Sequence, residues 1–480
     1  KQFTIIAGAP LRHGGFFGTA GYSGSPVSAF TILSVRAEPF SIFFPLFLPI
    51  FPSGLGWTPT HYFGHWKKSP MGLPIRLGFN ASPSTVMHID LNSCFASIEQ
   101  QANPLLRDKP IAVAAYDSPN GCILAPSVQA KRLGIKVGMR VKDGRLLCPD
   151  LIVLSSDPDK YRSVHAALKK TLSVYTPEVV PKSIDEFVLD FAGTPALKRG
   201  LFVIGREIKD RIKKEIGDYL TVSIGIGPNR FLAKTASNLH KPDGLDEINK
   251  DNFLKIYEGL TLTDLTGIAR QNAIRLNSAG IYTVLDFFEA DLRTLRSAFH
   301  SISDYYWFVR LRGWEVDDVD WGVKSFGHSY ALPKFLTKPE ELAPTLTKLV
   351  EKVGFRMRQA GFQARGVHLG LLFRDHEYWH QGIRVDRPVF LSRDIYRVAY
   401  RLLSHSPYHL PVRNLAVSCF DLSGRDRLQL CLFEDSLKKD RLVRALDEIN
   451  DRWGDFVITP ALMANTEDIV HDRIGFGRTS

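Results

Sequence analysis

Apolar and polar positions follow two alternating patterns between residues 85 and 242. Short apolar runs that fit strands are each followed by longer runs with apolar residues three or four positions apart, which fit helices. The expected strands are 85–91, 110–116, 151–156, 182–191 and 220–227, and the expected helices are 92–104, 126–139, 159–177, 201–217 and 229–242. This alternation predicts an α/β or α+β layer.

Beyond this region the pattern changes twice. Residues 242–316 carry mostly helical spacing, and a second alternating region follows the stretch KSFGHSY. There, helices at 339–359 and 394–403 precede strands at 366–373 and 413–422, which predicts a separate small α+β unit. The tail from residue 425 contains one charged helical pattern, LKKDRLVRALDEINDRWG.

Residues 1–84 differ from the rest of the chain. They are rich in Phe, Pro, Gly and Ser, poor in charge and without a strand or helix period, which predicts an extension without persistent structure. Its apolar run FSIFFPLFLPIFPSGLGW is interrupted by Pro45, Pro49 and Pro52, whereas a membrane span needs about twenty uninterrupted apolar residues. A membrane anchor is therefore the weaker alternative, and we expect no membrane partner.

The net charge indicates which kinds of partner the protein binds, and the cysteine content indicates the redox state of its compartment. The 480 residues carry a formal net charge of +11, and the sequence pI is about 9.3. Such a chain suits a polyanionic partner, nucleic acid first and an acidic membrane surface second. The five cysteines are scattered and form no CxxC pair, which argues for a reducing compartment and against a disulfide framework or a zinc site.

Three carboxylates stand at or near the ends of expected strands. Asp90 ends the first strand where a helix begins, and a carboxylate there can hold a cation beside a phosphate that faces the helix amides. Asp185 and Glu186 are neighbours, so strict alternation would point them to opposite faces. Both reach one site only at a strand end or a bend, which Pro181 upstream favours. The three would suffice for two Mg²⁺ ions about 3.5–4 Å apart, although an arbitrary Asp-Glu pair is more often simply solvated.

Three stretches, taken in order, resemble the Y-family translesion DNA polymerases: HIDLNSCFASIE, SIDEFVLD and IGIGPNRFLAKTASNLHKPDGL. The resemblance runs from about residue 85 to at least residue 435. It implies an α+β multidomain fold, a right-hand polymerase with a palm, small fingers, a helical thumb and a separate α+β little finger. The implied parts are an extension (1–84), palm (85–101 and 154–241), fingers (102–153), thumb (242–316), linker (317–325), little finger (326–424) and C-terminal tail (425–480).

The resemblance also implies the catalytic residues. Asp90, Asp185 and Glu186 are similar to the family's metal-binding carboxylates, and the carbonyl of Leu91 is a further ligand of two Mg²⁺ ions. The implied reaction is template-directed transfer of a deoxynucleotide from dNTP to a primer, in translesion synthesis on primer-template DNA.

Three further residues are implied to bind the nucleotide. Phe95 stands where the family keeps its steric gate, a ring under the sugar of the incoming nucleotide, and Lys234 stands where a lysine contacts the triphosphate. Lys131 occupies a position where many members carry a triphosphate-binding Arg, and it lacks the planar fork of that Arg. Other departures from the family pattern suggest a divergent bacterial branch; they are Val128 for Tyr, Asn92 for an acid and Cys94 for an aromatic residue.

The expected thumb and little finger carry features suited to DNA. The thumb stretch LTDLTGIARQNAIRLNSAGIYTVLDFF resembles a helix-hairpin-helix, whose turn amides hold a DNA phosphate, with Ala269 in place of the usual second glycine. A plain helical packing unit is the alternative. Four arginines of the little finger suit contact with the DNA backbone: Arg356, Arg358, Arg365 and Arg374.

The tail contains a short pattern that is similar to a clamp-binding peptide. In RLQLCLFEDS, Gln429, Leu430, Leu432 and Phe433 match the segment by which bacterial polymerases dock on the sliding clamp, and a strand that packs alternate residues inward is the alternative. We therefore expect a clamp partner, a monomer and a bacterial cytoplasmic location. Two rival functions are a catalytically silent DNA- and clamp-binding protein on the same fold and a nucleotidyl cyclase-like enzyme that shares the palm.

Overall fold

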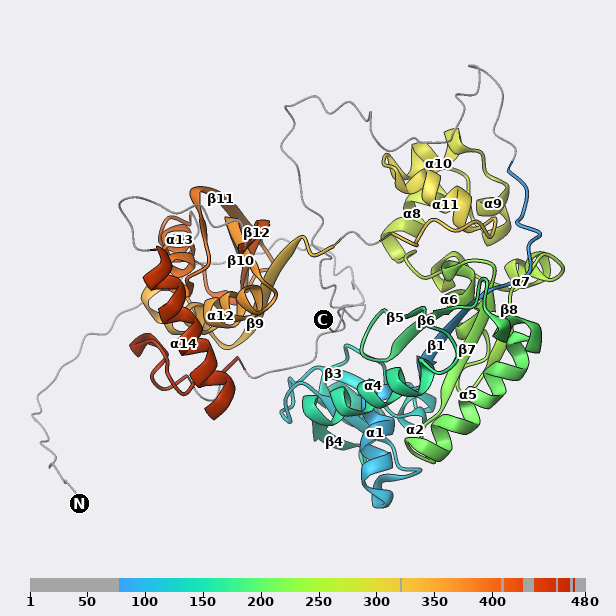
Figure 1. Cartoon of the computed structure of the whole chain (residues 1–480), viewed down its shortest axis with the longest axis horizontal. Coiled ribbons are helices and arrows are strands. Elements are labelled where there is room, and N and C mark those ends of the chain that lie inside the picture. Colours follow the sequence, from blue (N-terminus) through green and yellow to red (C-terminus); the bar gives the residue numbers. More distant parts are fainter. Residues whose placement is uncertain are drawn as a thin grey trace, which may run out of the picture. The chain divides into compact units, whose positions relative to one another are not determined.

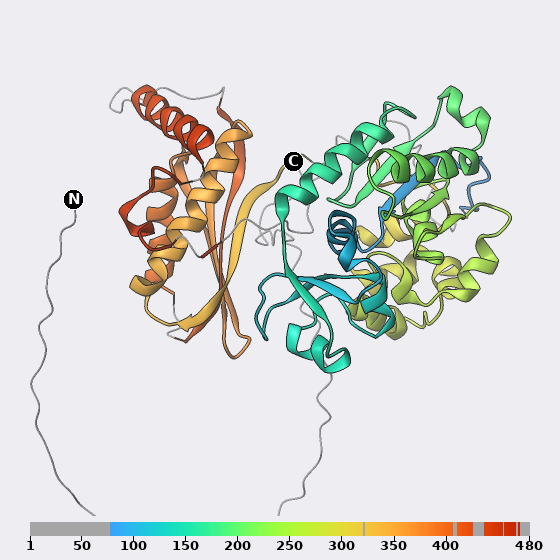
Figure 2. The same ribbon diagram turned by 90° about the horizontal axis from the view of Figure 1, so that it is seen from below.

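The computed structural model describes residues 77–319, 322–406, 410–425, 436–454, 456–466 and 469–470 (Figure 1; Figure 2). Residues 1–76 lie outside these ranges, as do the clamp-like residues Gln429, Leu430, Leu432 and Phe433. The described chain has the expected α+β multidomain architecture, with sheets of five, four and three strands. Within the described ranges, no helix has both the length and the apolar character needed to cross a bilayer.

The palm is built on a five-stranded sheet in the order β5-β6-β1-β7-β8. Its strands are β1 (Val86–Leu91), β5 (Val179–Pro181), β6 (Glu186–Asp190), β7 (Val222–Gly227) and β8 (Leu245–Glu247). β1 pairs antiparallel with both β6 and β7 and occupies the middle of the sheet, as Figure 1 shows. In this register Asp90 lies directly opposite Glu186. The expected strand 182–191 begins before the observed strand β6, which starts at Glu186. The strand β8 belongs to the palm sheet although its residues lie within the range assigned to the thumb.

Alternation along β1 separates the apolar core from the polar face of the sheet. Met87, Ile89 and Leu91 belong to the main core, which α1 (Cys94–Ala102), α4 (Pro158–Leu172) and α5 (Leu201–Glu215) complete. The other face carries His88 and Asp90, and α6 (Arg230–Leu239) packs over it through a small cluster of Val86, Val188 and Ala233.

The glycines of β7 allow α6 to approach the sheet closely. A Cβ atom on Gly225 would lie 2.0 Å from the Ala233 carbonyl oxygen and 2.1 Å from the Ser237 nitrogen, so no larger residue fits there. Asn229 caps the helix, because its side-chain oxygen accepts a 2.7 Å hydrogen bond from the Leu232 amide. The IGIG motif therefore sets how near α6 comes to the carboxylates of β1 and β6.

The fingers have a separate three-stranded sheet and a small core. The elements are β2 (Ile111–Ala114), β3 (Ile123–Pro126), β4 (Ile152–Ser155), α2 (Val128–Arg132) and α3 (Val141–Leu147). β4 pairs in parallel with β2, and Ser155 lies opposite Ala114. The predicted boundary between residues 153 and 154 cuts through this strand, so the fingers continue to Ser155.

The thumb is a helical unit around one aromatic core. Its helices are α7 (Phe253–Gly259), α8 (Arg270–Ser278), α9 (Val284–Glu289), α10 (Leu292–Phe299) and α11 (Ser303–Arg310). Ala269 precedes α8 with φ −89° and ψ 175°, an extended conformation that any residue adopts, so the missing glycine costs no backbone strain here. Gly267 has φ +101° and faces the Trp307 ring, which makes it the glycine that the turn requires.

The end of the predicted N-terminal extension is ordered and packs on the thumb. The Phe79 ring stacks on the Phe253 ring with 3.9 Å between their centroids, and the Asn80 amide donates a 2.7 Å hydrogen bond to the Arg312 carbonyl. The buried guanidinium of Arg312 in turn donates to the Leu77 carbonyl at 3.0 Å. Residues 77–84 therefore correct the expectation that the whole of 1–84 lacks persistent structure.

The little finger has a four-stranded antiparallel sheet in the order β11-β10-β12-β9. Its elements are β9 (Ser325–Leu336), α12 (Pro339–Gln359), β10 (Phe362–Phe373), β11 (Tyr378–Val389), α13 (Ser392–Ser404) and β12 (Val412–Gly424). Leu346, Leu369 and Val417 are among the buried residues by which α12, α13 and the sheet share one core. The two helices and the strands 366–373 and 413–422 were thus predicted at nearly their observed positions.

The tail adds a helix to the little finger and changes the role expected of one arginine. Arg358 is buried, and its guanidinium donates to both carboxylate oxygens of Asp447, at 2.7 and 2.8 Å, on α14 (Ser436–Trp453). The expectation that Arg358 contacts DNA is therefore wrong, because this side chain is already paired inside the protein. Arg356, Arg365 and Arg374 are exposed.

Candidate active site

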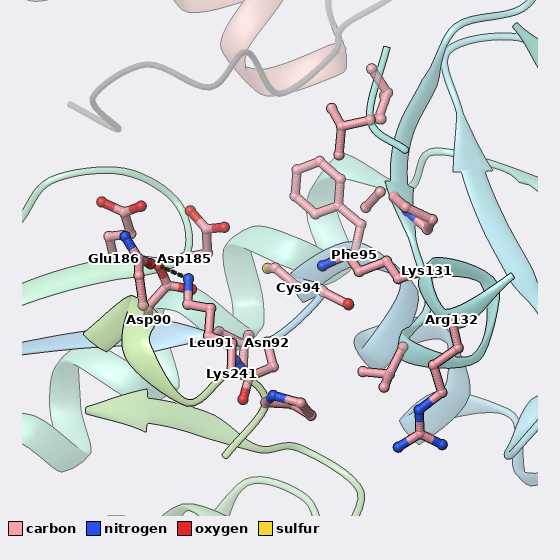
Figure 3. A pocket seen from close by; sticks show the side chains of 18 of the residues that line it. Asp90, Leu91, Asn92, Cys94, Phe95, Lys131, Arg132, Asp185, Glu186 and Lys241 are labelled. Carbon is pink, nitrogen blue, oxygen red and sulfur yellow. Dashed lines mark hydrogen bonds and ion pairs between the residues drawn. The ribbon is translucent and has the colours of Figure 1, made fainter. Parts of the chain in front are cut away.

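A cavity of about 620 Å³ lies where the palm and the fingers meet. Figure 3 shows the three acidic side chains on one side of it and Phe95, Lys131 and Arg132 on the other. All of the residues singled out in the sequence for metal or nucleotide binding line this one cavity: Asp90, Leu91, Phe95, Lys131, Asp185, Glu186 and Lys234. The fold therefore brings together residues that are up to 144 positions apart in the chain.

The strand register explains how the neighbours Asp185 and Glu186 reach one site. Glu186 is the first residue of β6 and faces Asp90 across the ladder, on the side of the sheet covered by α6. Asp185 precedes the strand, so alternation does not force its side chain to the opposite face. Its carbonyl accepts a 2.9 Å hydrogen bond from the Leu91 amide, and its carboxylate accepts a 2.5 Å bond from the Ser183 hydroxyl.

Two lysines neutralise part of the acidic charge. The Lys234 ammonium group donates to Asp90 Oδ2 at 2.5 Å and to Glu186 Oε1 at 2.7 Å. Lys241, in the loop after α6, donates to the same Asp90 oxygen at 2.7 Å. The sequence had singled out Lys234 but not Lys241.

His88 is a second residue at the site that sequence reasoning missed. It is buried two positions before Asp90 on β1, and its Nε2 atom lies 3.5 Å from Glu186 Oε2. Polar atoms of His88, Asp90 and Glu186 lie within 4.8 Å of one another, an arrangement that could hold a cation. The signal was available, because residues i and i+2 of a strand share a face.

Burial and neighbouring charges shift the pKa values of Asp185 and Glu186 in opposite directions. Burial, with the charges of Asp90 and Glu186, raises the pKa of Asp185. Burial acts in the same direction on Glu186, but the nearby His88 ring and the charge of Lys234 outweigh it and lower the pKa of Glu186. Burial, and then the charge of Lys234, lowers the pKa of His88, which favours a neutral ring. Such separation of pKa values is typical of functional sites.

The side of the cavity opposite the carboxylates includes the Phe95 ring and Lys131 (Figure 3). The Phe95 ring is 3% exposed and stacks on the Tyr161 ring, with centroids 4.3 Å apart. Burial, followed by the charges of Asp185 and Asp90, raises the pKa of the Cys94 thiol well above its ordinary value, which favours the neutral thiol over the reactive thiolate. Lys131 lines the cavity from α2, where burial and the charge of Lys241 lower its pKa.

Asn92, a departure from the family pattern, acts as a structural link. Its side-chain oxygen accepts hydrogen bonds from the Asp243 amide (2.9 Å) and the Thr221 hydroxyl (3.2 Å), and its amide donates to the Ser223 hydroxyl at 2.9 Å. An uncharged amide can both donate and accept in this network, which a carboxylate cannot. The residue thus joins β1, β7 and the loop that carries Lys241.

The donor set fits a hard divalent cation. Such ions take oxygen ligands, and Asp90, Asp185 and Glu186 all direct carboxylates to the same cavity. Asp185 lies outside the tighter group formed by His88, Asp90 and Glu186. Asp90 and Glu186 already bind cationic groups within the protein, the ammonium groups of Lys234 and Lys241.

Comparison with known proteins agrees with this geometry. The impB/mucB/samB family matches residues 89–238, and the C-terminal domain of that family matches residues 323–432. DNA polymerase IV of Pelotomaculum thermopropionicum is 32% identical over 397 residues, which span 81% of this chain and 98% of that protein. The chain belongs to the Y family of DNA polymerases. DNA polymerase IV 1 of Bacillus subtilis is 30% identical over 392 residues, covering 80% of this chain and 94% of that protein.

Comparison with solved structures shows that the fold is shared. The solved Y-family DNA polymerase chimera Dbh-Dpo4(243-245)-Dbh is 22% identical and matches with a TM-score of 0.63. The match covers 70% of this chain and 98% of the chimera. Y-family membership implies the use of divalent metal ions, consistent with the carboxylates at the cavity.

Proposed function

We propose that this protein is a lesion-bypass DNA polymerase that transfers a deoxynucleotide from dNTP to the 3′-OH of a primer, as directed by a template. The observation that carries the proposal is the convergence of Asp90, Asp185 and Glu186 on a cavity whose other wall is the Phe95 ring. The family membership of the chain and the names of its relatives support it.

The roles of the residues follow from their chemistry. Asp90, Asp185, Glu186 and the Leu91 carbonyl would hold two Mg²⁺ ions, which when bound neutralise charge on the phosphates and on the attacking oxygen. Lys234 provides a positive charge for the triphosphate from α6, and Phe95 limits the space at the sugar.

Primer extension by the full chain tests the proposal. With Mg²⁺, a primer-template and four dNTPs, we expect template-directed extension, and on a template with an abasic site we expect synthesis past the lesion. The alternative, a catalytically weak DNA- and clamp-binding accessory protein, predicts binding of the same DNA without incorporation. DNA binding with no detectable incorporation in Mg²⁺ or Mn²⁺ would favour that alternative.

We further propose that the tail segment RLQLCLFEDS docks on a sliding clamp. An extended peptide of this composition can place Leu432 and Phe433 in an apolar pocket and the Gln429 amide at its rim. Docking would raise the local concentration of the enzyme at the primer end without changing its active site. A monomeric enzyme of the bacterial cytoplasm remains the expectation from the resemblance.

The clamp proposal predicts a separation of two activities. The double variant Leu432→Ala/Phe433→Ala should extend a primer on DNA without clamp at the wild-type rate, while stimulation by added bacterial clamp disappears. Leu437→Ala, an exposed leucine just beyond the segment, serves as the matched control and should keep the stimulation. Persistent stimulation of the double variant would instead assign the segment a structural role.

A further inference from the structure

Residues 77–84, here called the N-terminal strap, connect the thumb directly to the central strand of the palm. Phe79 packs against the thumb core, where its ring stacks on the Phe253 ring with 3.9 Å between the centroids. Just beyond the strap, the Thr85 carbonyl accepts a 2.9 Å hydrogen bond from the Phe191 amide of the palm, and β1 begins at the next residue. The strap therefore joins the thumb to the strand that carries the first of the catalytic carboxylates.

The strap also forms hydrogen bonds with the end of the thumb. The backbone amide of Asn80 donates to the Arg312 carbonyl at 2.7 Å, and its side-chain amide donates to the Gly313 carbonyl at 3.0 Å. In the opposite direction, the indole N–H of Trp314 donates to the Gly78 carbonyl at 3.0 Å. A Cβ atom on Gly313 would lie 3.3 Å from the Cβ atom of Asn80, so the two segments are in close contact.

The buried charge of Arg312 depends in part on the strap. This residue is 6% exposed, and its guanidinium lies 3.7 Å from the centroid of the Phe308 ring. The hydrogen bonds described for the guanidinium go to the carbonyls of Leu77 (3.0 Å), Phe308 (2.9 Å) and Phe288. Burial lowers the pKa of Arg312 to about 10. Loss of the Leu77 carbonyl would leave one donor of this buried cation without its acceptor, which costs free energy.

A second connection holds the same end of the thumb from α6. The side-chain amide of Asn229 donates to the carbonyls of Arg310, at 3.0 Å, and of Trp314, at 2.9 Å. The Arg230 guanidinium pairs with the Glu315 carboxylate at 3.2 Å. The end of the thumb is therefore attached to two elements that carry residues of the candidate active site, to β1 through the strap and to α6 directly.

A thumb that is held in place lowers the free-energy cost of binding DNA at two points. The proposed function places the primer end at the palm cavity, and the expected helix-hairpin-helix of the thumb holds a phosphate of the same duplex. The hairpin residue Ile268 belongs to the same core as Phe253, the partner of the strap. Once DNA contacts one of two sites on a fixed frame, the second contact forms at a high effective concentration. A loosely attached thumb would instead lose its freedom of movement each time DNA binds.

We propose that the N-terminal strap positions the thumb for DNA, so that Phe79 and Asn80 slow the dissociation of primer-template without taking part in nucleotidyl transfer. Both are positioning residues, because they act through the thumb and line no part of the palm cavity that is described. This role falls on residues that precede the family match, which begins at residue 89. The inference rests on the proposed polymerase function.

The rate at which labelled primer-template leaves the full chain, measured with an excess of unlabelled DNA as a trap, tests the proposal. Phe79→Ala removes the ring that stacks on the thumb and should dissociate about tenfold faster than the wild type, which corresponds to about 1.4 kcal/mol. It should also add fewer nucleotides per binding event. Single-turnover incorporation at saturating DNA should keep the wild-type rate, because the cavity is unchanged. Ser82→Ala is the matched control, since Ser82 is an exposed strap residue whose described hydrogen bond comes from its backbone amide.

A second variant weakens the same contact from the thumb side. Trp314→Phe keeps an aromatic ring and loses the hydrogen bond to the Gly78 carbonyl, so it should raise the dissociation rate severalfold. Unchanged dissociation rates in both variants, from a wild type that extends primers, would overturn the strap proposal alone. A loss of incorporation in step with a smaller fraction of active enzyme would overturn it as well, because the strap would then serve only folding. If the wild type incorporates no nucleotide, the proposed function fails, and the strap proposal fails with it.

Discussion

Asp185→Asn and Glu186→Gln are each expected to slow primer extension about a thousandfold or more while the affinity for primer-template DNA changes little. Each substitution keeps the size of the side chain and removes one negative charge from a site that must hold two cations. Charge stabilisation by such ions is worth several kcal/mol in the transition state, and about 1.4 kcal/mol corresponds to a factor of ten in rate. The DNA contacts expected from the sequence lie elsewhere, on the thumb and little finger.

The measurement is single-turnover incorporation of one dNTP, paired with DNA binding by fluorescence anisotropy. Asp190→Asn is the matched control, because Asp190 ends the same strand and its carboxylate accepts only a local bond from the Ala192 amide at 2.9 Å among the contacts described for it. It should extend primers at nearly the wild-type rate. Near-normal extension by the Asp185 or Glu186 variant would remove that residue from the metal site.

The central strands of the palm could be predicted because their sequence signals are local. β1 and β7 are short apolar runs bounded by turns, and the structure places them within two residues of the expected ranges. β3 was missed because most of it lies between the expected strand 110–116 and the expected helix 126–139, and the strand is defined by its pairing with β2. The fingers boundary was misplaced for a related reason: only the pairing with β2 shows that β4 belongs to the fingers.

Site residues that stand in a recognisable sequence motif could be predicted. Residues whose role depends on a contact with a distant part of the chain could not. The carboxylates and Phe95 stand in stretches that resemble the family, and the fold brings them to one cavity. Lys241 could not be distinguished from a solvated lysine, because its partner Asp90 is 151 positions away. Arg358 was assigned to DNA binding because its partner Asp447 is also distant in the sequence. Without that partner in view, an arginine on a basic unit is expected to contact DNA.

The last prediction concerns the role of Phe95 in the discrimination between ribonucleotides and deoxynucleotides. Its ring is buried and held by stacking on Tyr161, whose hydroxyl donates a 2.9 Å hydrogen bond to Glu99. Lys160 completes this support with a 2.7 Å contact to the same carboxylate. Because the ring is fixed from behind, it cannot retreat from an added 2′-hydroxyl, and a ribonucleotide would clash with it.

Phe95→Ala is therefore expected to raise incorporation of ribonucleotides relative to deoxynucleotides by about a hundredfold, the range that pocket contacts of this size can provide. The measurement is kcat/KM for rCTP and dCTP opposite template dG. Tyr161→Phe keeps the stacked ring and loses only the hydroxyl, so its selectivity should match the wild type. Phe95→Leu provides a smaller change in case the alanine variant loses stability. If both Phe95 variants incorporate dCTP and keep the wild-type ratio, Phe95 is an ordinary core residue, and sugar selection must come from another part of the cavity.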